Sequence, residues 1–186
     1  PRPQVVSSTY PGHSPDCSRR EVLYRLLFVP LGCVSQAHSF RISTTWTGND
    51  GKGTADYRSY RRDHEMTGPG KSAPIAGSSD PAFRGDGSRY NPEELLVASL
   101  SACHLLWMLH LCADAGIVIT NYQDDAAGTM VLASDGGGQF SRVVLRPRMT
   151  ITDSARIGEA EALHVRAHQL CFIARSVNFP VEHQAT

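Results

Sequence analysis

The sequence has no excess of charge of either sign, and this absence narrows the possible functions. Its 186 residues carry 18 basic and 18 acidic side chains, so the formal net charge is zero. Proteins that bind nucleic acid normally show a basic excess on one face. The balance therefore argues against a nucleic-acid partner. The length suits one domain with a sizeable core and is short for two.

Closely spaced cysteines are also missing. The five cysteines are scattered along the chain: Cys17, Cys33, Cys103, Cys112 and Cys171. An odd, widely spaced set does not fit a secreted disulfide framework and favours a reducing compartment, the cytoplasm. There is no Cys-x-x-Cys or His-x-x-Glu-His motif, and the best metal-ligating pair is His168 with Cys171. We therefore expect neither a metal nor another cofactor.

One long stretch lacks charged side chains altogether. Residues 95–113 contain no Asp, Glu, Lys or Arg, which is long enough to span a bilayer. The stretch includes His104 and His110, however, and no cationic anchors flank it. A central helix buried in a soluble domain explains it better, so we expect no membrane association.

Residues 1–37 show no sustained period and are rich in proline and serine. Residues 22–32 resemble a weak secretion signal, but Arg25 and Pro30 interrupt the apolar run. An unstructured leader is the favoured interpretation. We therefore expect an appended tail over 1–37 and one domain over 38–186.

The first part of that domain predicts a β-hairpin. Residues 40–46 alternate and are β-rich, residues 48–53 form a turn cluster, and residues 54–60 suit a second strand. Residues 67–90 are dense in Gly, Pro, Ser and Asp, which predicts a long loop of the kind that is usually functional.

A second hairpin is predicted after the charge-free stretch. Residues 118–133 and 139–151 are β-rich, and the run Ser-Asp-Gly-Gly-Gly at 134–138 joins them. Two hairpins and two long helices give an α+β domain.

The central helix has clear start and stop signals. Asn91 suits the N-cap, Pro92 the first turn, and Glu93 and Glu94 complement the positive end of the helix dipole. Gly116 can end the helix. Because apolar residues surround the whole circumference, one small domain does not cover this helix, and a homodimer would.

The last helix is predicted from residue 154 to about residue 176, capped by Thr152 or Asp153. Its apolar positions keep helical spacing, and Cys171 falls on the inward stripe. Residues 178–181 suit a short final strand.

Cys103 and Cys171 therefore place two thiols on two helices. The commonest fate of a free cysteine is to act as a small core residue, and this alternative stays open for both. Cys112 lies nine residues beyond Cys103 and points to the other side of the helix, so we assign it to packing.

The chain resembles the OsmC/Ohr family of thiol peroxidases. The resemblance lies in Asn-Pro-Glu-Glu-Leu-Leu at 91–96, Ser-Ala-Cys at 101–103 and His-Gln-Leu-Cys at 168–171. Shorter motifs are similar to those of an OsmC-like subgroup: Trp-Thr-Gly at 46–48, Gly-Lys-Gly-Thr at 51–54, Gly-Lys at 70–71 and Phe-Arg-Gly-Asp at 83–86. The similarity covers about residues 38 to 182.

The resemblance implies a fold in which antiparallel hairpins wrap around long central helices, in an intertwined homodimer with sites at the interface. It also implies metal-free reduction of organic hydroperoxides, with hydrogen peroxide as a second candidate substrate, in oxidative-stress defence. Cys103 would attack as a thiolate and become a sulfenic acid, Cys171 would condense with it to a disulfide, and a dithiol would restore both.

A guanidinium is the natural partner for the thiolate, and an acid would hold it in place. Arg84 is our first choice, Arg62 the second, and Glu93 the acid. Ten residues separate Glu93 from Cys103, about 15 Å along a helix. The arginine must therefore bridge them, or Glu93 must act across a subunit interface.

A non-enzymatic function on the same scaffold is the alternative. His104 and Trp107 are bulkier than the residues common at these positions in the family, and either pack or reshape the pocket. In the alternative, a cleft in the dimer holds an apolar ligand, or the thiols sense redox state, without turnover.

Overall fold

A computed structural model describes residues 37–186. The predicted tail, with Cys17 and Cys33, therefore lies outside the described residues apart from Ala37. Residues Arg41–Thr186 form one unit. Its elements in chain order are β1 (Ser43–Trp46), β2 (His64–Thr67), β3 (Ile75–Gly77), η1 (Pro81–Phe83), α1 (Pro92–Asp114), β4 (Ile119–Asp124), β5 (Ala127–Leu132), β6 (Gly138–Leu145), β7 (Pro147–Ile151), η2 (Ser154–Arg156), α2 (Ile157–Leu170), η3 (Ala174–Ser176) and β8 (Val181–His183).

The first sheet is antiparallel in the order β1-β2-β3. The expected second strand at residues 54–60 is wrong, because β1 pairs with β2 and the segment between them is an ordered loop. In this loop the Arg62 guanidinium lies 4.3 Å and 4.2 Å from the ring centres of Tyr57 and Tyr60. It also donates hydrogen bonds to both of their carbonyls. The aromatic residues that suggested a strand hold an arginine instead.

The long segment at residues 67–90 contains β3 and η1, so it is less irregular than predicted. Its second half is held by buried Ser78, whose hydroxyl donates to Asp63 and accepts from the Asp86 amide. Gly85 passes so close to the chain that an added Cβ would lie 1.5 Å from the Ser79 carbonyl oxygen. Only glycine fits there.

Helix α1 begins and ends as the sequence predicts. The Asn91 side chain accepts from the Glu94 amide at 2.7 Å, and the Glu94 carboxylate accepts from the Asn91 amide at 3.1 Å. This capping box satisfies two amides that the helix leaves unpaired. Gly116 has a positive φ of 68°, as a glycine beyond a helix end often does. Arg156 donates to the carbonyls of Ala115 and Gly116.

The two predicted β runs after α1 are each divided into two strands. The first run becomes β4 and β5, and the second becomes β6 and β7. Because β4 pairs with β7 and β5 pairs with β6, the one expected hairpin becomes two ladders. The breaks at residues 125–126 and 146 face each other, where Asp124 accepts from the Arg146 amide at 2.6 Å. Arg148 forms an ion pair with Asp125 at 2.7 Å. The tight turn at 133–137 is where the sequence predicts it.

Helix α2 is shorter than predicted and stops at Leu170. Asp153 caps η2, the turn that precedes α2, and its carboxylate accepts from the Ala155 amide. Helix α2 itself starts after Arg156, without a side-chain cap. Cys171 has an extended backbone, with φ −62° and ψ 111°, and so ends the helix. The final strand β8 lies slightly beyond the predicted position and runs parallel to β6.

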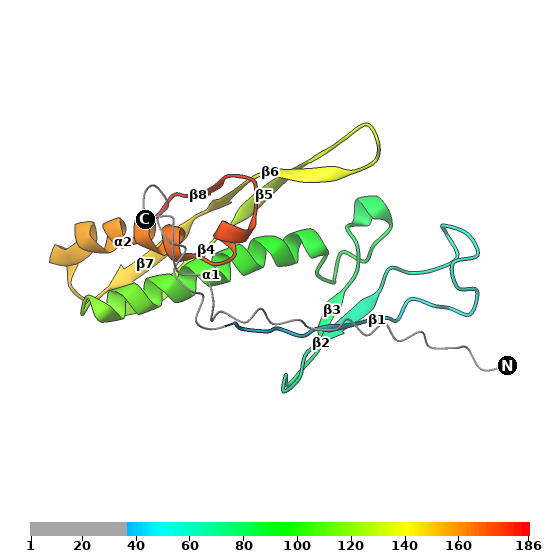
Figure 1. Ribbon diagram of the computed structural model, residues 1–186, viewed down its shortest axis with the longest axis horizontal. Helices are drawn as coiled ribbons and strands as arrows, with labels where there is room; N and C mark the ends of the chain where they lie inside the picture. Colours follow the sequence, from blue (N-terminus) through cyan, green and yellow to red (C-terminus); the bar gives the residue numbers. More distant parts are fainter. Residues whose placement is uncertain (1–36) are drawn as a thin grey trace, which may run out of the picture. The chain divides into compact units, whose positions relative to one another are not determined.

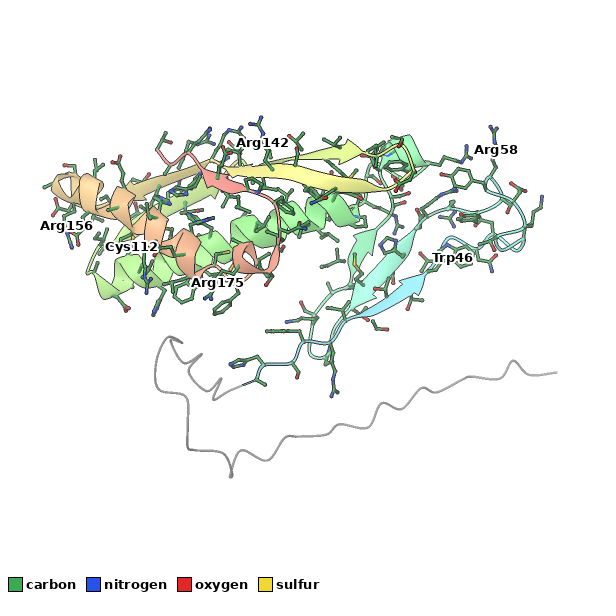
Figure 2. All side chains as sticks on the ribbon, turned by 45° about the horizontal axis from the view of Figure 1, so that its top comes forward. Trp46, Arg58, Cys112, Arg142, Arg156 and Arg175 are labelled. Atoms are coloured by element: carbon green, nitrogen blue, oxygen red, sulfur yellow. The ribbon has the colours of Figure 1, made fainter. Side chains whose placement is uncertain are left out.

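Helices α1 and α2 lie side by side (Figure 1). Their contact face contains Met108 and Cys112 from α1 and Ala160 and Ala167 from α2, all buried. Figure 2 labels Cys112 on α1, and its burial agrees with the packing role expected of it. A second core cluster joins Leu100 of α1 to β6.

Much of α1 is not covered by its own chain. Leu106 is 65% exposed and Leu109 is 42% exposed. Helix α1 is long and apolar enough to cross a membrane, yet only 22% of its most apolar 18-residue stretch is buried. The single chain therefore does not bury this helix as the sequence led us to expect.

Candidate active site

Two thiols meet where α1 passes the end of α2. Cys103 lies in the middle of α1 and is half-buried, whereas Cys171 lies directly after α2 and is 2% exposed. Both are free thiols, and they lie near enough for Cys103 to affect the pKa of Cys171. The fold thus brings together two cysteines that are 68 positions apart in sequence.

The two thiols have different electrostatic surroundings. Burial, together with the neighbouring Cys103 thiol, raises the pKa of Cys171 to about 11. Cys171 therefore keeps its proton at neutral pH.

The end of α2 fixes Cys171 in this position. The Cys171 sulfur accepts from the Ala174 amide at 3.4 Å, and the Cys171 carbonyl accepts from the Arg175 amide. The next residue, Phe172, packs edge-on against Trp107 of α1, with 5.7 Å between ring centres. Trp107, predicted either to pack or to reshape the site, therefore packs one helical turn from Cys103.

Four histidines gather beside the thiols, on α1, α2 and β8. The ring of His104 is stacked 5.2 Å from His164 and 5.7 Å from His183, and His168 lies 6.0 Å from His183. His104 Nε2 and His164 Nδ1 are 2.9 Å apart, which is a hydrogen bond. The cluster occupies the interior next to Cys103.

Burial keeps three of these rings uncharged. Loss of hydration, and then the neighbouring imidazoles, lower the pKa of His104 to about 3. The same causes lower the pKa of His164 to about 4, and burial also lowers that of His183. The rings of His104, His164 and His183 are therefore neutral at pH 7, and each has one donor and one acceptor nitrogen.

Stacked rings do not direct their nitrogens to a common point. Within residues 37–186, no group of three or more His, Cys, Asp or Glu side chains is arranged to hold a metal ion. His168 and Cys171 belong to the histidine cluster and the thiol pair, respectively.

The two candidate arginines differ in their contacts. Arg62 is half-buried, fixed over Tyr57 and Tyr60 as described above. Arg84 is exposed, has a left-handed backbone with φ 68°, and forms no side-chain hydrogen bond or ion pair with a described residue. Neither arginine hydrogen-bonds to Cys103 in this chain, so no contact within it selects between them.

Glu93 lines a cavity of about 750 Å³ along the first half of α1. Apolar walls come from β5, β6 and the segment before α1, including Phe83, Met130 and Phe140. Besides Glu93, three more carboxylates line the cavity, those of Asp80, Glu94 and Asp124. Ala102 lines the cavity, but Cys103 does not. Within one chain Glu93 and Cys103 are therefore on different faces of α1, as an action of Glu93 across an interface would require.

A family model described as "OsmC-like protein" matches residues 85–185, more than half of the chain and including both thiols. The chain belongs to this family. No curated protein matches it.

Solved structures of OsmC-like proteins share the fold. An OsmC-like protein of unknown function from Vibrio cholerae has a TM-score of 0.73 and 29% identity, covering 81% of this chain and 100% of that one. An organic hydroperoxide resistance protein OsmC from Legionella pneumophila has a TM-score of 0.61 and 17% identity, covering 81% of this chain and 98% of that one. The organic hydroperoxide resistance protein OhrB of Bacillus subtilis has a TM-score of 0.56 and 18% identity, covering 80% of this chain and 98% of that one. The OsmC-like α+β fold is therefore as predicted.

The histidine cluster is the feature that the sequence reasoning missed. His164 and His168 are four residues apart and Cys171 follows three later, which places all three near one face of α2. That spacing could have indicated the cluster. No spacing along α2 indicates His183, because the separate strand β8 supplies it.

Proposed function

We propose that this protein is a thiol-dependent reductase of organic hydroperoxides. The observation that carries the proposal is that half-buried Cys103 lies beside buried Cys171 and affects its pKa. Membership of the OsmC-like family supports it, since two relatives of the same fold are called organic hydroperoxide resistance proteins.

The chemistry follows from the two environments. The Cys103 thiolate attacks the distal peroxide oxygen, the O–O bond breaks, and an alcohol leaves, so that Cys103 becomes a sulfenic acid. The Cys171 sulfur then displaces the hydroxyl group from Cys103. The proton of Cys171 leaves with that hydroxyl as water, and a disulfide forms. A dithiol returns both residues to thiols by exchange.

The remaining parts of the proposal concern Arg84, Glu93 and a second copy of the chain. A homodimer would cover the apolar face of α1 and bring new side chains to Cys103. Exposed Arg84 is free to stabilise the thiolate and the peroxide, and Glu93 to orient it across the interface. We propose the cytoplasm as the compartment, because reducing dithiols operate there.

Turnover of cumene hydroperoxide with dithiothreitol tests this function, with hydrogen peroxide as the second substrate. Cys103→Ser should abolish turnover. Cys171→Ser should consume one equivalent of peroxide and accumulate a sulfenic acid on Cys103. Cys112→Ser is the matched control, and should retain activity because Cys112 contributes only packing. A peroxide-induced disulfide that includes Cys112 would contradict the assignment.

A binding function is the second candidate, and the 750 Å³ cavity favours it. An apolar cavity with a few polar groups is typical of a ligand site. This candidate predicts no turnover with either peroxide, together with saturable binding of an apolar fluorescent probe that Met130→Trp weakens.

A further inference from the structure

Each helix that presents a thiol also presents a buried histidine, and these two histidines meet. His104 directly follows Cys103 on α1, and His164 precedes Cys171 by seven residues, two turns of α2. His104 is 1% exposed and His164 is 2% exposed. Their Nε2 and Nδ1 atoms are 2.9 Å apart, so the pair connects the two helices beside the two thiols.

This contact is costly for a core. Burying a polar ring forfeits its hydration, and only a matched donor and acceptor recover part of that loss. His104 Nδ1 is buried and has no hydrogen-bond partner among the described residues. Two aliphatic side chains would fill the same space without these costs. What the pair adds is direction, because a hydrogen bond holds two atoms at a defined distance and angle.

The surrounding packing lacks this directionality. Ala160 and Ala167 let α2 approach α1 closely, but their small, smooth surfaces do little to fix how far α2 is shifted along α1. Cys171 lies one turn beyond Ala167, so a shift of α2 moves its sulfur away from Cys103. Disulfide formation tolerates little such movement.

We propose that the His104–His164 hydrogen bond is a positioning contact that holds α1 and α2 at the shift at which Cys103 and Cys171 form a disulfide. The inference deepens the proposed function, on which its biological role rests, but the contact itself makes a prediction that needs no peroxide. His183 stacks on both rings from β8 and completes the support.

The equilibrium between the two thiols and oxidised dithiothreitol measures this positioning at pH 7. One disulfide forms in the protein and one breaks in the reagent, which takes up the two protons and two electrons. His164→Ala removes the contact and should lower the equilibrium constant about tenfold, which is about 30 mV. The double variant His104→Gln, His164→Asn should restore it, because Gln places an amide where Nε2 lay and Asn where Nδ1 lay.

Two controls separate positioning from general damage. His110→Asn changes a surface histidine of α1, and Met108→Ala makes a core defect beside the pair; both should leave the equilibrium constant unchanged. An unchanged constant in His164→Ala would overturn the proposal. So would a loss that the double variant does not restore, or an equal loss in Met108→Ala. Absent peroxidase activity would leave this test intact, because no peroxide is used.

Discussion

At the scale of single residues, function depends on how a few side chains change the charge of their neighbours. Cys171 and Cys103 are the same residue type, yet Cys171 is fully buried, which raises its pKa to about 11, whereas Cys103 is half-buried. Arg62 and Arg84 are likewise the same type, but only Arg84 is available to a partner. Local environment, more than residue identity, sets these differences.

Replacing Arg84 with Ala should leave the fold intact, because an exposed loop arginine packs against little. If Arg84 stabilises the Cys103 thiolate, the pH profile of Cys103 alkylation should move upward, with a rate about tenfold lower at pH 7. Mass spectrometry of the alkylated peptide measures this. Overlapping profiles for wild type and Arg84→Ala would eliminate Arg84, and Arg62→Ala would then be the variant to compare.

Acid should destabilise the fold through the histidine cluster. The pKa of His104 is about 3 and that of His164 about 4, below the ordinary value of 6.5 in the unfolded chain. The unfolded state therefore binds more protons below about pH 7, and stability falls as the pH falls from there toward about pH 3.

Urea unfolding should show a loss of about 2 to 4 kcal/mol between pH 7 and pH 5. The double variant His104→Gln, His164→Asn cannot take up these protons and should show a much smaller slope. Parallel slopes for the two proteins would mean that other groups cause the acid sensitivity.

At the scale of elements, the start of one helix supports the end of another. The Arg156 guanidinium, just before α2, donates to the carbonyls of Ala115 and Gly116 directly after α1. The Glu159 carboxylate holds the guanidinium at 2.7 Å. This connection fixes the α1–α2 corner, and Figure 2 labels Arg156 there. It lies at the opposite end of α2 from Cys171.

Arg156→Ala should therefore lower the free energy of unfolding by about 1 to 2 kcal/mol, because it leaves two carbonyls with weaker partners. Arg166→Ala is the matched control on the exposed side of α2, where a single 3.3 Å contact to Gln169 contributes little. Urea titration at pH 7 compares them. Equal effects of the two substitutions would refute a specific role for Arg156 at this corner.

At the scale of the whole molecule, α1 leaves an apolar face exposed in the single chain. We expect a homodimer at micromolar concentration, and light scattering should give twice the mass of the chain. Leu106→Glu places a charge on the 65% exposed Leu106 and should shift the protein toward monomer. Val131→Glu, at a 59% exposed residue of β5, should stay dimeric. A monodisperse wild-type monomer would argue against the dimer and against a site shared between subunits.

The sequence by itself determined the features that depend on neighbours along the chain. Asn91, Pro92 and Gly116 mark the limits of α1 because caps act within one turn. The glycine-rich turn near residue 136 is equally local. Helical spacing also placed Cys171 facing inward, and the motifs around both thiols indicated the family.

Only the tertiary structure decided what depends on contacts between distant segments. Strand β2 starts at His64 because Tyr57 and Tyr60 pack around Arg62, a use of aromatic residues that β propensity cannot anticipate. The β runs divide where Asp124 reaches Arg146 across the fold. The raised pKa of Cys171 and the neutral rings of His104 and His164 likewise depend on burial. That burial exists only where the fold brings α1, α2 and β8 together.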